Sequence, residues 1–339
     1  MSNKMRAMAI KGYGKNSPLV EMEFPIPDVK EHDVLIEIHA ASVNPIDFKI
    51  RNGDVRLLMS SPMPFILGND LSGVVKQVGG QVTKFRVGDK VYTRPPHDRS
   101  GTFAEFIAVN EDHVAPMPKG MSFEDAASIP LVGLTAYQAL HDCLHAKQGD
   151  KVLIHAGAGG FGTFAIQLAK QMGLYVATTA SEKGHDLVKS LGADEIVNYR
   201  TEKFEEKLHD YDGVIDTIGG NTLLNSFKVV KKGHKVVSIS AIPDGEFGRK
   251  HRLGFVVTSL LRLASARIVY NASCQGAVYE FLLMQENGSQ LREITKLVED
   301  GKIKPVIDRV YSFEEAQQAL HYVESGRAKG KVVIKVHPN

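Results

Sequence analysis

The sequence has little of several features that mark particular classes of protein. Only two of its 339 residues are cysteines, Cys143 and Cys274, which argues against a disulfide framework or a cysteine-rich zinc site. Its charges nearly balance at a net +2, so nothing electrostatic favours nucleic acid or a membrane as partner. The longest apolar stretch, residues 253–270, contains two arginines, which argues against a membrane span. The first residues lack the apolar core of a signal peptide, so we expect a cytoplasmic protein.

The length of the chain favours two domains, and the character of the sequence changes near residue 120. Short β-branched or alternating runs, separated by Gly, Pro and Asp, predict strands over residues 33–43, 71–79, 89–94 and 102–110. Helix-forming residues follow over 122–146, with Ser122 as a candidate cap. The first third of the chain is therefore expected to be rich in β-structure.

Beyond residue 150, apolar strands alternate with helices. The predicted helices cover residues 160–173 and 183–193, and the predicted strands cover residues 151–157, 174–180, 195–199, 213–219, 234–240 and 267–273. The tail adds helices and a closing strand. Near-continuous apolar strands that alternate with helices predict an α/β fold with a doubly wound parallel sheet.

A glycine-rich loop lies between the first predicted strand and helix of this region. Gly157, Gly159 and Gly162 have the spacing GxGxxG, with Gly160 and Phe161 between them. In this position Gly157 permits a tight turn, Gly159 lets the backbone approach a pyrophosphate, and Gly162 lets the helix lie close to the strand. The helix N-terminus supplies N–H groups for the phosphates, so the loop predicts a dinucleotide site.

The end of the next strand indicates which dinucleotide binds. An NAD site usually has an acidic residue there, whereas this strand ends at Thr179, Ala180 and Ser181. Small residues leave room for a 2′-phosphate, and Lys183 can supply positive charge. We therefore predict NADPH. If the strand ends two residues later, Glu182 is the ribose-binding acid and the preference shifts toward NADH.

Eight segments carry a resemblance to a known family: "ASVNPIDFKIRNG", "PFILGNDLSGVV", "VGDKVY", "GTFAEF", "IPLVGLTAYQAL", "HAGAGGFG", "LGADEIVNY" and "GRAKGKVVI". In combination they resemble the medium-chain dehydrogenase/reductase superfamily, and within it the zinc-free quinone oxidoreductase branch, which includes zeta-crystallin and the enone reductases. The resemblance implies a GroES-like β-barrel catalytic domain (residues 1–124), a Rossmann domain (125–274) and a C-terminal return (275–339) that completes the first domain. Homodimers are common in this branch.

The resemblance also indicates what the site lacks. The three side chains that bind catalytic zinc in the alcohol dehydrogenases match Asn44, Asn69 and Leu131 here, none of which is a Cys or His. The chemistry expected without zinc is hydride transfer from NADPH to an electron-poor acceptor, a quinone or an α,β-unsaturated carbonyl.

The resemblance implies three candidate catalytic residues in "ASVNPIDFKI". The Asn that matches Asn44 lies beside the nicotinamide in the family, although Asn44 also suits a turn before Pro45. Lys49 either holds the nicotinamide ribose or carboxamide, or donates to the substrate oxygen, unless it is an ordinary surface amine. Asp47 is expected to orient Lys49 or the local backbone.

Further cofactor contacts are implied along the chain. Thr135 matches a residue beside the nicotinamide, and Tyr199 matches a position near the adenosine 2′-phosphate. Gly330 and Lys331 match a C-terminal cofactor contact.

Two other functions stay open from the sequence. An enoyl-thioester reductase would need a proton donor, for which Tyr92 and Tyr137 are candidates. A nucleotide-responsive binding protein would need little catalytic machinery, but the sequence shows no basic strip with aromatic residues. His141 and His145 share a helix face without a third ligand, so we predict no metal site.

Overall fold

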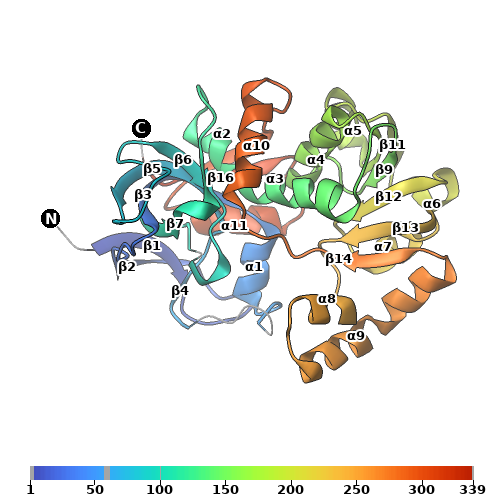
Figure 1. The fold of residues 1–339 in the computed structure, drawn as a ribbon, viewed down its shortest axis with the longest axis horizontal. Coiled ribbons are helices and arrows are strands. Elements are labelled where there is room, and N and C mark those ends of the chain that lie inside the picture. Colours follow the sequence, from blue (N-terminus) through green and yellow to red (C-terminus); the bar gives the residue numbers. More distant parts are fainter. Residues whose placement is uncertain (1–3, 57–61, 100, 338–339) are drawn as a thin grey trace. The chain divides into compact units, whose positions relative to one another are not determined.

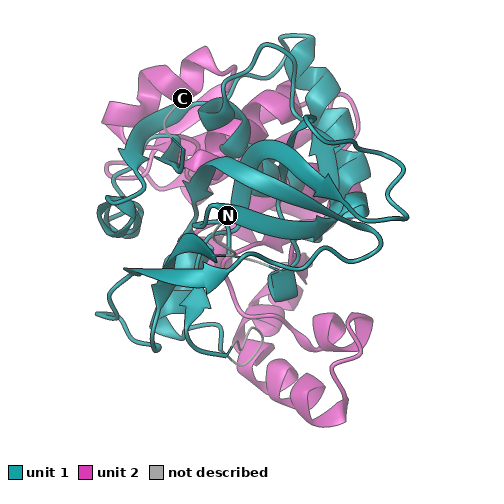
Figure 2. Ribbon diagram, turned by 90° about the vertical axis from the view of Figure 1, so that its left-hand side faces the viewer, with its two compact units in different colours: residues 1–134, 285–339 teal, residues 135–284 magenta. Residues whose placement is uncertain are grey.

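The computed structural model describes residues 4–56, 62–99 and 101–337. The chain forms two compact units, residues 1–134 with 285–339 (unit 1) and residues 135–284 (unit 2), drawn in teal and magenta in Figure 2. The predicted boundaries, after residues 124 and 274, lie ten residues before the boundaries of these units. The second difference arises because the last strand of the unit 2 sheet, β14 (Val278–Phe281), lies beyond residue 274.

Unit 1 is built from two sheets. A three-stranded sheet has the order β2-β1-β4, and a seven-stranded sheet has the order β15-β16-β3-β5-β6-β8, with β7 also paired to β3. The strands are β1 Lys4–Ile10, β2 Val20–Pro25, β3 Asp33–Val43, β4 Phe65–Ile66, β5 Asp70–Val78, β6 Lys90–Thr93, β7 Phe106–Asn110, β8 Val114–Pro116, β15 Ile307–Ser312 and β16 Lys331–Lys335. The helices are α1 Pro45–Asn52, α2 Phe123–Ala127, α3 Pro130–Tyr137 (which continues into unit 2), α10 Gly288–Glu299 and α11 Ala316–Glu324.

The closing strand β16 returns to the N-terminal third of the chain. It pairs antiparallel with β3, with Val332 opposite Val43, and its other neighbour is β15. Its apolar side chains join those of β3 and β5 in one buried core. This register sets Lys331, the first residue of β16, beside the end of β3, where α1 begins.

Unit 2 is a six-stranded parallel sheet with helices between its strands (Figure 1), as predicted. The strand order is β11-β10-β9-β12-β13-β14. The strands are β9 Lys151–Ile154, β10 Tyr175–Ala180, β11 Glu195–Asn198, β12 Tyr211–Asp216, β13 Val230–Ser238 and β14 Val278–Phe281. The helices are α4 Gly160–Gln171, α5 Glu182–Ser190, α6 Phe204–Lys207, α7 Gly220–Ser226, α8 Gly245–Lys250 and α9 Phe255–Cys274.

The strand order reverses direction between β9 and β12. Right-handed crossovers then place α4 and α5 on one face of the sheet and α7 on the other. Open sheets of this kind bind ligands beyond the carboxyl ends of the strands at the reversal point. The glycine-rich loop lies at that edge, directly after β9.

Two local predictions were inaccurate. Residues 267–273 do not form a strand, because they are the last turns of the 20-residue helix α9, which ends before Gly276. The helix predicted over 122–146 is interrupted, since Pro130 begins a new helix and a π-helical turn covers Gln138–Cys143. Its cap is confirmed, because the Ser122 hydroxyl accepts the Asp125 N–H at 3.0 Å.

Within the described ranges, no helix is both long and apolar enough to cross a bilayer.

Candidate functional site

The glycine loop of unit 2 has the close backbone contacts that its sequence predicts. A Cβ atom built on Gly162 would lie 2.5 Å from the Ala156 carbonyl oxygen and 2.5 Å from Gly157 Cα, so only glycine lets α4 approach the turn. Gly159 caps α4 with extended backbone, and its nearest neighbour would be 3.3 Å from an added Cβ. The 12-residue helix therefore presents its first N–H groups beside a loop rich in glycine. These residues fit a pyrophosphate.

The strand end that governs the choice of dinucleotide is also defined. Strand β10 ends at Ala180, and Ser181 is the N-cap of α5, so Glu182 and Lys183 lie in the first helical turn. Tyr199 follows β11 at the same edge of the sheet, where its N–H donates to the Ala180 carbonyl at 3.3 Å. The Tyr199 side chain is exposed. The position directly after the strand is therefore a serine rather than a carboxylate.

The buried His155 contacts Thr179, whose hydroxyl accepts a hydrogen bond from the loop. The Thr179 hydroxyl accepts the Ala156 N–H at 3.1 Å, so its own hydrogen is available to Nδ1 of His155, 3.2 Å away. The Ser226 hydroxyl donates to the Thr222 carbonyl at 2.7 Å and so accepts from Nε2 of His155 at 3.0 Å. This network assigns the only imidazole hydrogen to Nε2. Burial lowers the pKa of His155 to about 4, so the imidazole is neutral at pH 7.

The stability of the protein is expected to fall in mild acid because of His155. In the unfolded chain His155 is protonated below its ordinary pKa of 6.5, whereas in the folded protein it is protonated only below about 4. The contribution of the neutral imidazole to the stability of the fold is therefore complete above pH 6.5 and is lost as the pH falls toward 4. This term amounts to about 2 kcal/mol at pH 5. Urea unfolding at pH 7 and pH 5 should show a smaller pH dependence for H155Q than for wild type. H209Q, which changes an exposed histidine, should keep the wild-type dependence.

In unit 1, a network of buried polar side chains is centred on Asp70. Its Oδ2 accepts hydrogen bonds from the Ser42 hydroxyl at 2.7 Å and from Asn44 Nδ2 at 2.8 Å, and it lies 3.3 Å from the Lys331 ammonium. Its Oδ1 accepts the Leu131 N–H at 2.7 Å, in the first turn of α3. All of these groups lie in unit 1, and the lysine comes from the closing strand.

The same network holds the start of α1. Asn44 precedes the helix, and its N–H donates to Asp47 Oδ2 at 2.7 Å. Asp47 is the third helical residue, whose side chain is the acceptor in a capping box. The other carboxylate oxygen of Asp47 accepts from Asn69 Nδ2 at 2.6 Å, and Lys331 donates to Asn44 Oδ1 at 2.5 Å. The amide of Asn44 is therefore fixed at both ends.

Burial changes the ionisation of this network. Burial raises the pKa of Asp47 to about 7, the Asp70 carboxylate adds to the rise, and the Asn44 and Asn69 hydrogen bonds oppose it. Burial also lowers the pKa of Lys331, and the carboxylates of Asp70 and Asp47 oppose that shift. The network thus places one ammonium group beside two carboxyl groups, and the buried Arg94 guanidinium also interacts electrostatically with both of them.

The structure assigns several predicted residues to positions that the sequence left open. Asp47 orients the local backbone and not Lys49, since its two oxygens bind Asn44 and Asn69. Lys49 is half-buried two residues further along α1, and within the described ranges its ammonium group has no hydrogen-bond or ion-pair partner. The sequence did not reveal the central position of Asp70. Its one available signal was the pair of polar residues in "GND".

The C-terminal pair and Thr135 have local explanations as well. Gly330 has a φ of 96°, and an added Cβ would lie 2.4 Å from the Val306 carbonyl oxygen. This close approach delivers Lys331 to the buried network. Thr135 is a buried residue of α3. Contact of Asn44, Thr135 or Lys331 with a nicotinamide stays a prediction, because the geometry within each unit does not test it.

The three positions that match zinc ligands meet at the network. Asn44 and Leu131 both donate to Asp70, and Asn69 donates to the same Asp47 that caps Asn44. Among the residues that the structure describes, no three His, Cys, Asp or Glu side chains form a group that could hold a metal ion.

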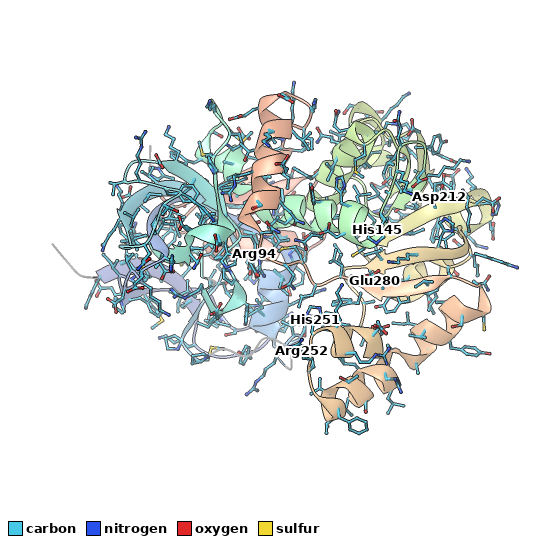
Figure 3. All side chains as sticks on the ribbon, viewed as in Figure 1. Arg94, His145, Asp212, His251, Arg252 and Glu280 are labelled. Atoms are coloured by element: carbon cyan, nitrogen blue, oxygen red, sulfur yellow. The ribbon has the colours of Figure 1, made fainter. Side chains whose placement is uncertain are left out.

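Two buried residues near the network have structural partners. The Tyr92 hydroxyl donates to the Leu291 carbonyl at 2.9 Å and contacts the Thr295 hydroxyl at 2.9 Å, and burial raises the pKa of Tyr92. Tyr92 therefore ties β6 to α10 and is not a free proton donor for a thioester substrate. Arg94, labelled in Figure 3, pairs with Glu286.

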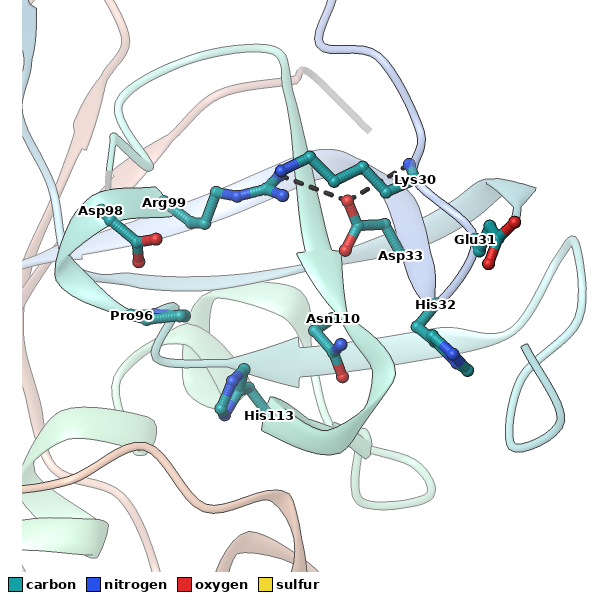
Figure 4. A pocket seen from close by; sticks show the side chains of 9 residues that line it. All are labelled: Lys30, Glu31, His32, Asp33, Pro96, Asp98, Arg99, Asn110 and His113. Atoms are coloured by element: carbon teal, nitrogen blue, oxygen red, sulfur yellow. Dashed lines mark hydrogen bonds and ion pairs between the residues drawn. The ribbon is translucent and has the colours of Figure 1, made fainter. Parts of the chain in front are cut away.

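A separate pocket in unit 1 contains none of the predicted site residues (Figure 4). It has a volume of about 490 Å³ and is lined by Lys30, Glu31, His32, Asp33, Pro96, Asp98, Arg99, Asn110 and His113. Asp33 accepts from the Lys30 N–H at 3.3 Å and pairs with Arg99 at 3.2 Å. A lining this polar differs from the mostly apolar lining of small-molecule sites, so we assign it no part in the chemistry.

Comparisons with known proteins bear on the whole chain. Residues 30–119 match the family described as "Alcohol dehydrogenase GroES-like domain", and residues 191–334 match "Zinc-binding dehydrogenase". The 2-methylene-furan-3-one reductase of Solanum lycopersicum is 37% identical, over 99% of this chain and 80% of its own. The mitochondrial NAD(P)H oxidoreductase RTN4IP1 of Mus musculus is 34% identical, over 99% of this chain and 90% of its own. A solved structure, the quinone oxidoreductase from Coxiella burnetii, is 35% identical with a TM-score of 0.83, and covers 98% of this chain and 100% of its own.

The chain belongs to the medium-chain dehydrogenase/reductase superfamily. The fold predicted from the sequence, a GroES-like domain with a Rossmann-like parallel sheet, is confirmed. The protein is an oxidoreductase of the branch that contains quinone oxidoreductases and enone reductases, and its cofactor is a nicotinamide dinucleotide. The superfamily includes zinc enzymes, and the prediction that Asn44, Asn69 and Leu131 stand at their three ligand positions stays a prediction from the resemblance.

Proposed function

We propose that this protein is an NADPH-dependent, zinc-independent reductase that transfers hydride to α,β-unsaturated carbonyls or quinones. The observation that carries the proposal is the network around Asp70. At the three positions that match zinc ligands it has two amides and a leucine, and the amides are bonded to carboxylates. A relative that matches 99% of this chain over 80% of its own length is named for a methylene-furanone, which is a conjugated enone.

The bound cofactor would supply the hydride. The residues of the chain bind and orient the reactants. The N-terminus of α4 and its glycines favour the pyrophosphate, and the buried network holds Asn44 rigidly at the start of α1. Lys49 is proposed to hold the nicotinamide ribose or carboxamide, or to stabilise the negative charge that develops on the substrate oxygen. A primary amine that has no competing partner among the described residues can serve either role.

NADPH oxidation with a panel of enones and quinones tests the proposal. We expect turnover that is unchanged after dialysis against EDTA, and no stoichiometric zinc by metal analysis. K49M should lower kcat/KM by about tenfold or more, a loss on the scale of one charged hydrogen bond. K11M, at an exposed lysine, is the matched control. Loss of activity with EDTA would contradict zinc independence, and tight NADPH binding without turnover of any acceptor would favour a binding protein.

The preference for NADPH is proposed from Ser181, Lys183 and Tyr199 at the strand edge. Ser181 is the N-cap of α5 but its side chain makes no cap hydrogen bond, and aspartate is also favoured at this position, so S181D should retain folding while it adds a carboxylate that repels a 2′-phosphate. We expect the NADPH-over-NADH ratio of kcat/KM to fall by about tenfold or more. K183A should shift the ratio in the same direction, and K189A, at an exposed lysine of the same helix, should not. An unchanged ratio in both S181D and K183A would contradict the assignment.

The cytoplasmic location stays a prediction, since the mouse relative is named as mitochondrial. The absence of nucleic-acid partners also stays a prediction from the charge balance.

A further inference from the structure

Helix α9 of unit 2 exposes large apolar side chains to solvent. Val256, Leu260, Leu263 and Tyr270 are 69%, 61%, 76% and 70% exposed. The opposite side of the helix is covered by its own unit, where Ala272 is buried and Ile268 packs against the core of the sheet. Figure 1 shows α9 with α8 beside it, next to the edge strand β14. A helix that is apolar on both sides is ordinarily buried on both sides.

The exposed side chains follow a regular spacing. We call Val256, Leu260, Leu263, Arg267, Tyr270 and Cys274 the α9 seam. Successive members are four, three, four, three and four residues apart, which is the a/d spacing of helices that pack on other helices. Each member is exposed. The spacing therefore indicates another helix as the partner of this face.

The seam is also its own complement. Its spacing reads the same in both directions, so two antiparallel copies related by a twofold axis match every position. In this register Val256 faces Cys274, Leu260 faces Tyr270 and Leu263 faces Arg267 of the other copy. A twofold interface requires this reciprocity, because each contact between two positions occurs twice, once in each direction between the copies. A parallel pair would instead place Arg267 against Arg267, and like charges directly opposed are unfavourable.

The charges and the area agree with a second copy as the occupant. Helix α9 has Arg262 and Arg267 and no acidic residue, so only the antiparallel register sets each seam arginine against an apolar side chain. The seam together with Phe255, which is 87% exposed, offers on the order of 600 Å² per copy, near the lower limit for stable interfaces of about 1,200 Å² in total.

We propose that α9 binds α9 of a second copy of this chain, antiparallel, about a twofold axis at the level of Ser265. The homodimer expected from the family resemblance then has this helix in its interface. This proposal does not depend on the substrate or the cofactor.

Sedimentation velocity over a concentration series tests the interface and its register. Wild type is expected to dimerise. L260E should weaken the dimer by about a hundredfold, because the carboxylate meets Tyr270 in a desolvated contact. L263E should stay within about threefold of wild type, since its carboxylate meets Arg267 of the other copy. V87E, which introduces the same carboxylate at an exposed valine of unit 1, should have no effect. A wild type that stays monomeric, or an L263E as disruptive as L260E, would overturn the proposal.

Cross-linking tests the same register without disturbing the charge. V256C should form a disulfide between position 256 of one copy and Cys274 of the other under mild oxidation, and V256C/C274S should not form this 256–274 bond. Wild type should not form a Cys274–Cys274 bond, because the antiparallel register separates the two sulfurs by about 27 Å along the axis. Such a bond in wild type would indicate parallel packing and would overturn the proposal.

Cosedimentation with anionic vesicles tests the other possible occupant, a lipid surface. If the wild-type protein were monomeric and bound the vesicles, and L260E did not bind them, a lipid surface would be the occupant and the proposal would be overturned.

Discussion

K331M is expected to lower the free energy of unfolding by about 3–5 kcal/mol, a loss typical of a buried ion pair broken from one side. Lys331 is 5% exposed and donates to Asn44 at 2.5 Å, with Asp70 at 3.3 Å. Without the ammonium group, the Asp70 carboxylate loses its ion pair with Lys331, and the amide of Asn44 loses the donor to its oxygen. Methionine fills a similar volume, so the loss reports charge and hydrogen bonding more than packing.

Urea unfolding at pH 7 measures this loss, and the double variant D70N/K331M identifies its cause. Removing both charges should recover at least half of the stability, because the cost comes from the uncompensated carboxylate. The loss in K331M should shrink as the pH falls from 7 to 5, because the charge on Lys331 holds down the raised pKa of Asp47 and its removal lets Asp47 stay protonated. K335M, on the same strand but paired loosely with Glu124 at 3.7 Å, should cost less than about 1 kcal/mol. Equal losses in K331M and K335M would contradict the buried-pair interpretation.

Alanine substitutions at two glycines, Gly162 and Gly159, are expected to have different effects. In G162A the new methyl would lie 2.5 Å from the backbone of Ala156 and Gly157, which no side-chain rotation relieves, so α4 must move away from the turn. We expect a stability loss of about 2–3 kcal/mol. In G159A the new methyl meets one atom at 3.3 Å, so folding should change by less than about 1 kcal/mol. If the loop binds the pyrophosphate as proposed, the same methyl would stand in its way, so NADPH affinity should fall by about tenfold or more.

Calorimetric titration with NADPH and thermal unfolding of the same samples separate the two effects. G80A is the matched control, since no atom lies within 4 Å of its added Cβ, and it should change neither quantity. If G159A bound NADPH as wild type does, the pyrophosphate would have to lie elsewhere, and the dinucleotide assignment of this loop would be wrong.

Local sequence features predicted the parts of this fold that local physics controls. The strand over residues 33–43 was predicted at its observed bounds, because a long alternating run between polar breaks has few other conformations. The close backbone contacts of the glycine loop were predicted because glycines in a fixed order along the chain are what such a tight turn requires. Ser122 was predicted as a cap from its own type and position.

Other features arise from contacts that no short segment encodes. Residues 267–273 have the composition of a strand but continue a helix, because the choice depends on the 20-residue element to which they belong. The role of Asp47 also depended on a distant partner. Its neighbour in sequence, Lys49, is not its partner, and the amide of Asn69 is.

By itself the sequence determined the two-part fold, and it predicted the dinucleotide loop and the replacement of the zinc ligands by Asn44, Asn69 and Leu131. Only the tertiary structure decided how Asn44 is held. Its amide oxygen binds Lys331, 287 residues away, because β16 pairs with β3 and brings the ammonium group into a buried site with two carboxyl groups. Burial makes the loss of this contact costly in free energy of unfolding, and burial is a property of the folded chain rather than of any segment.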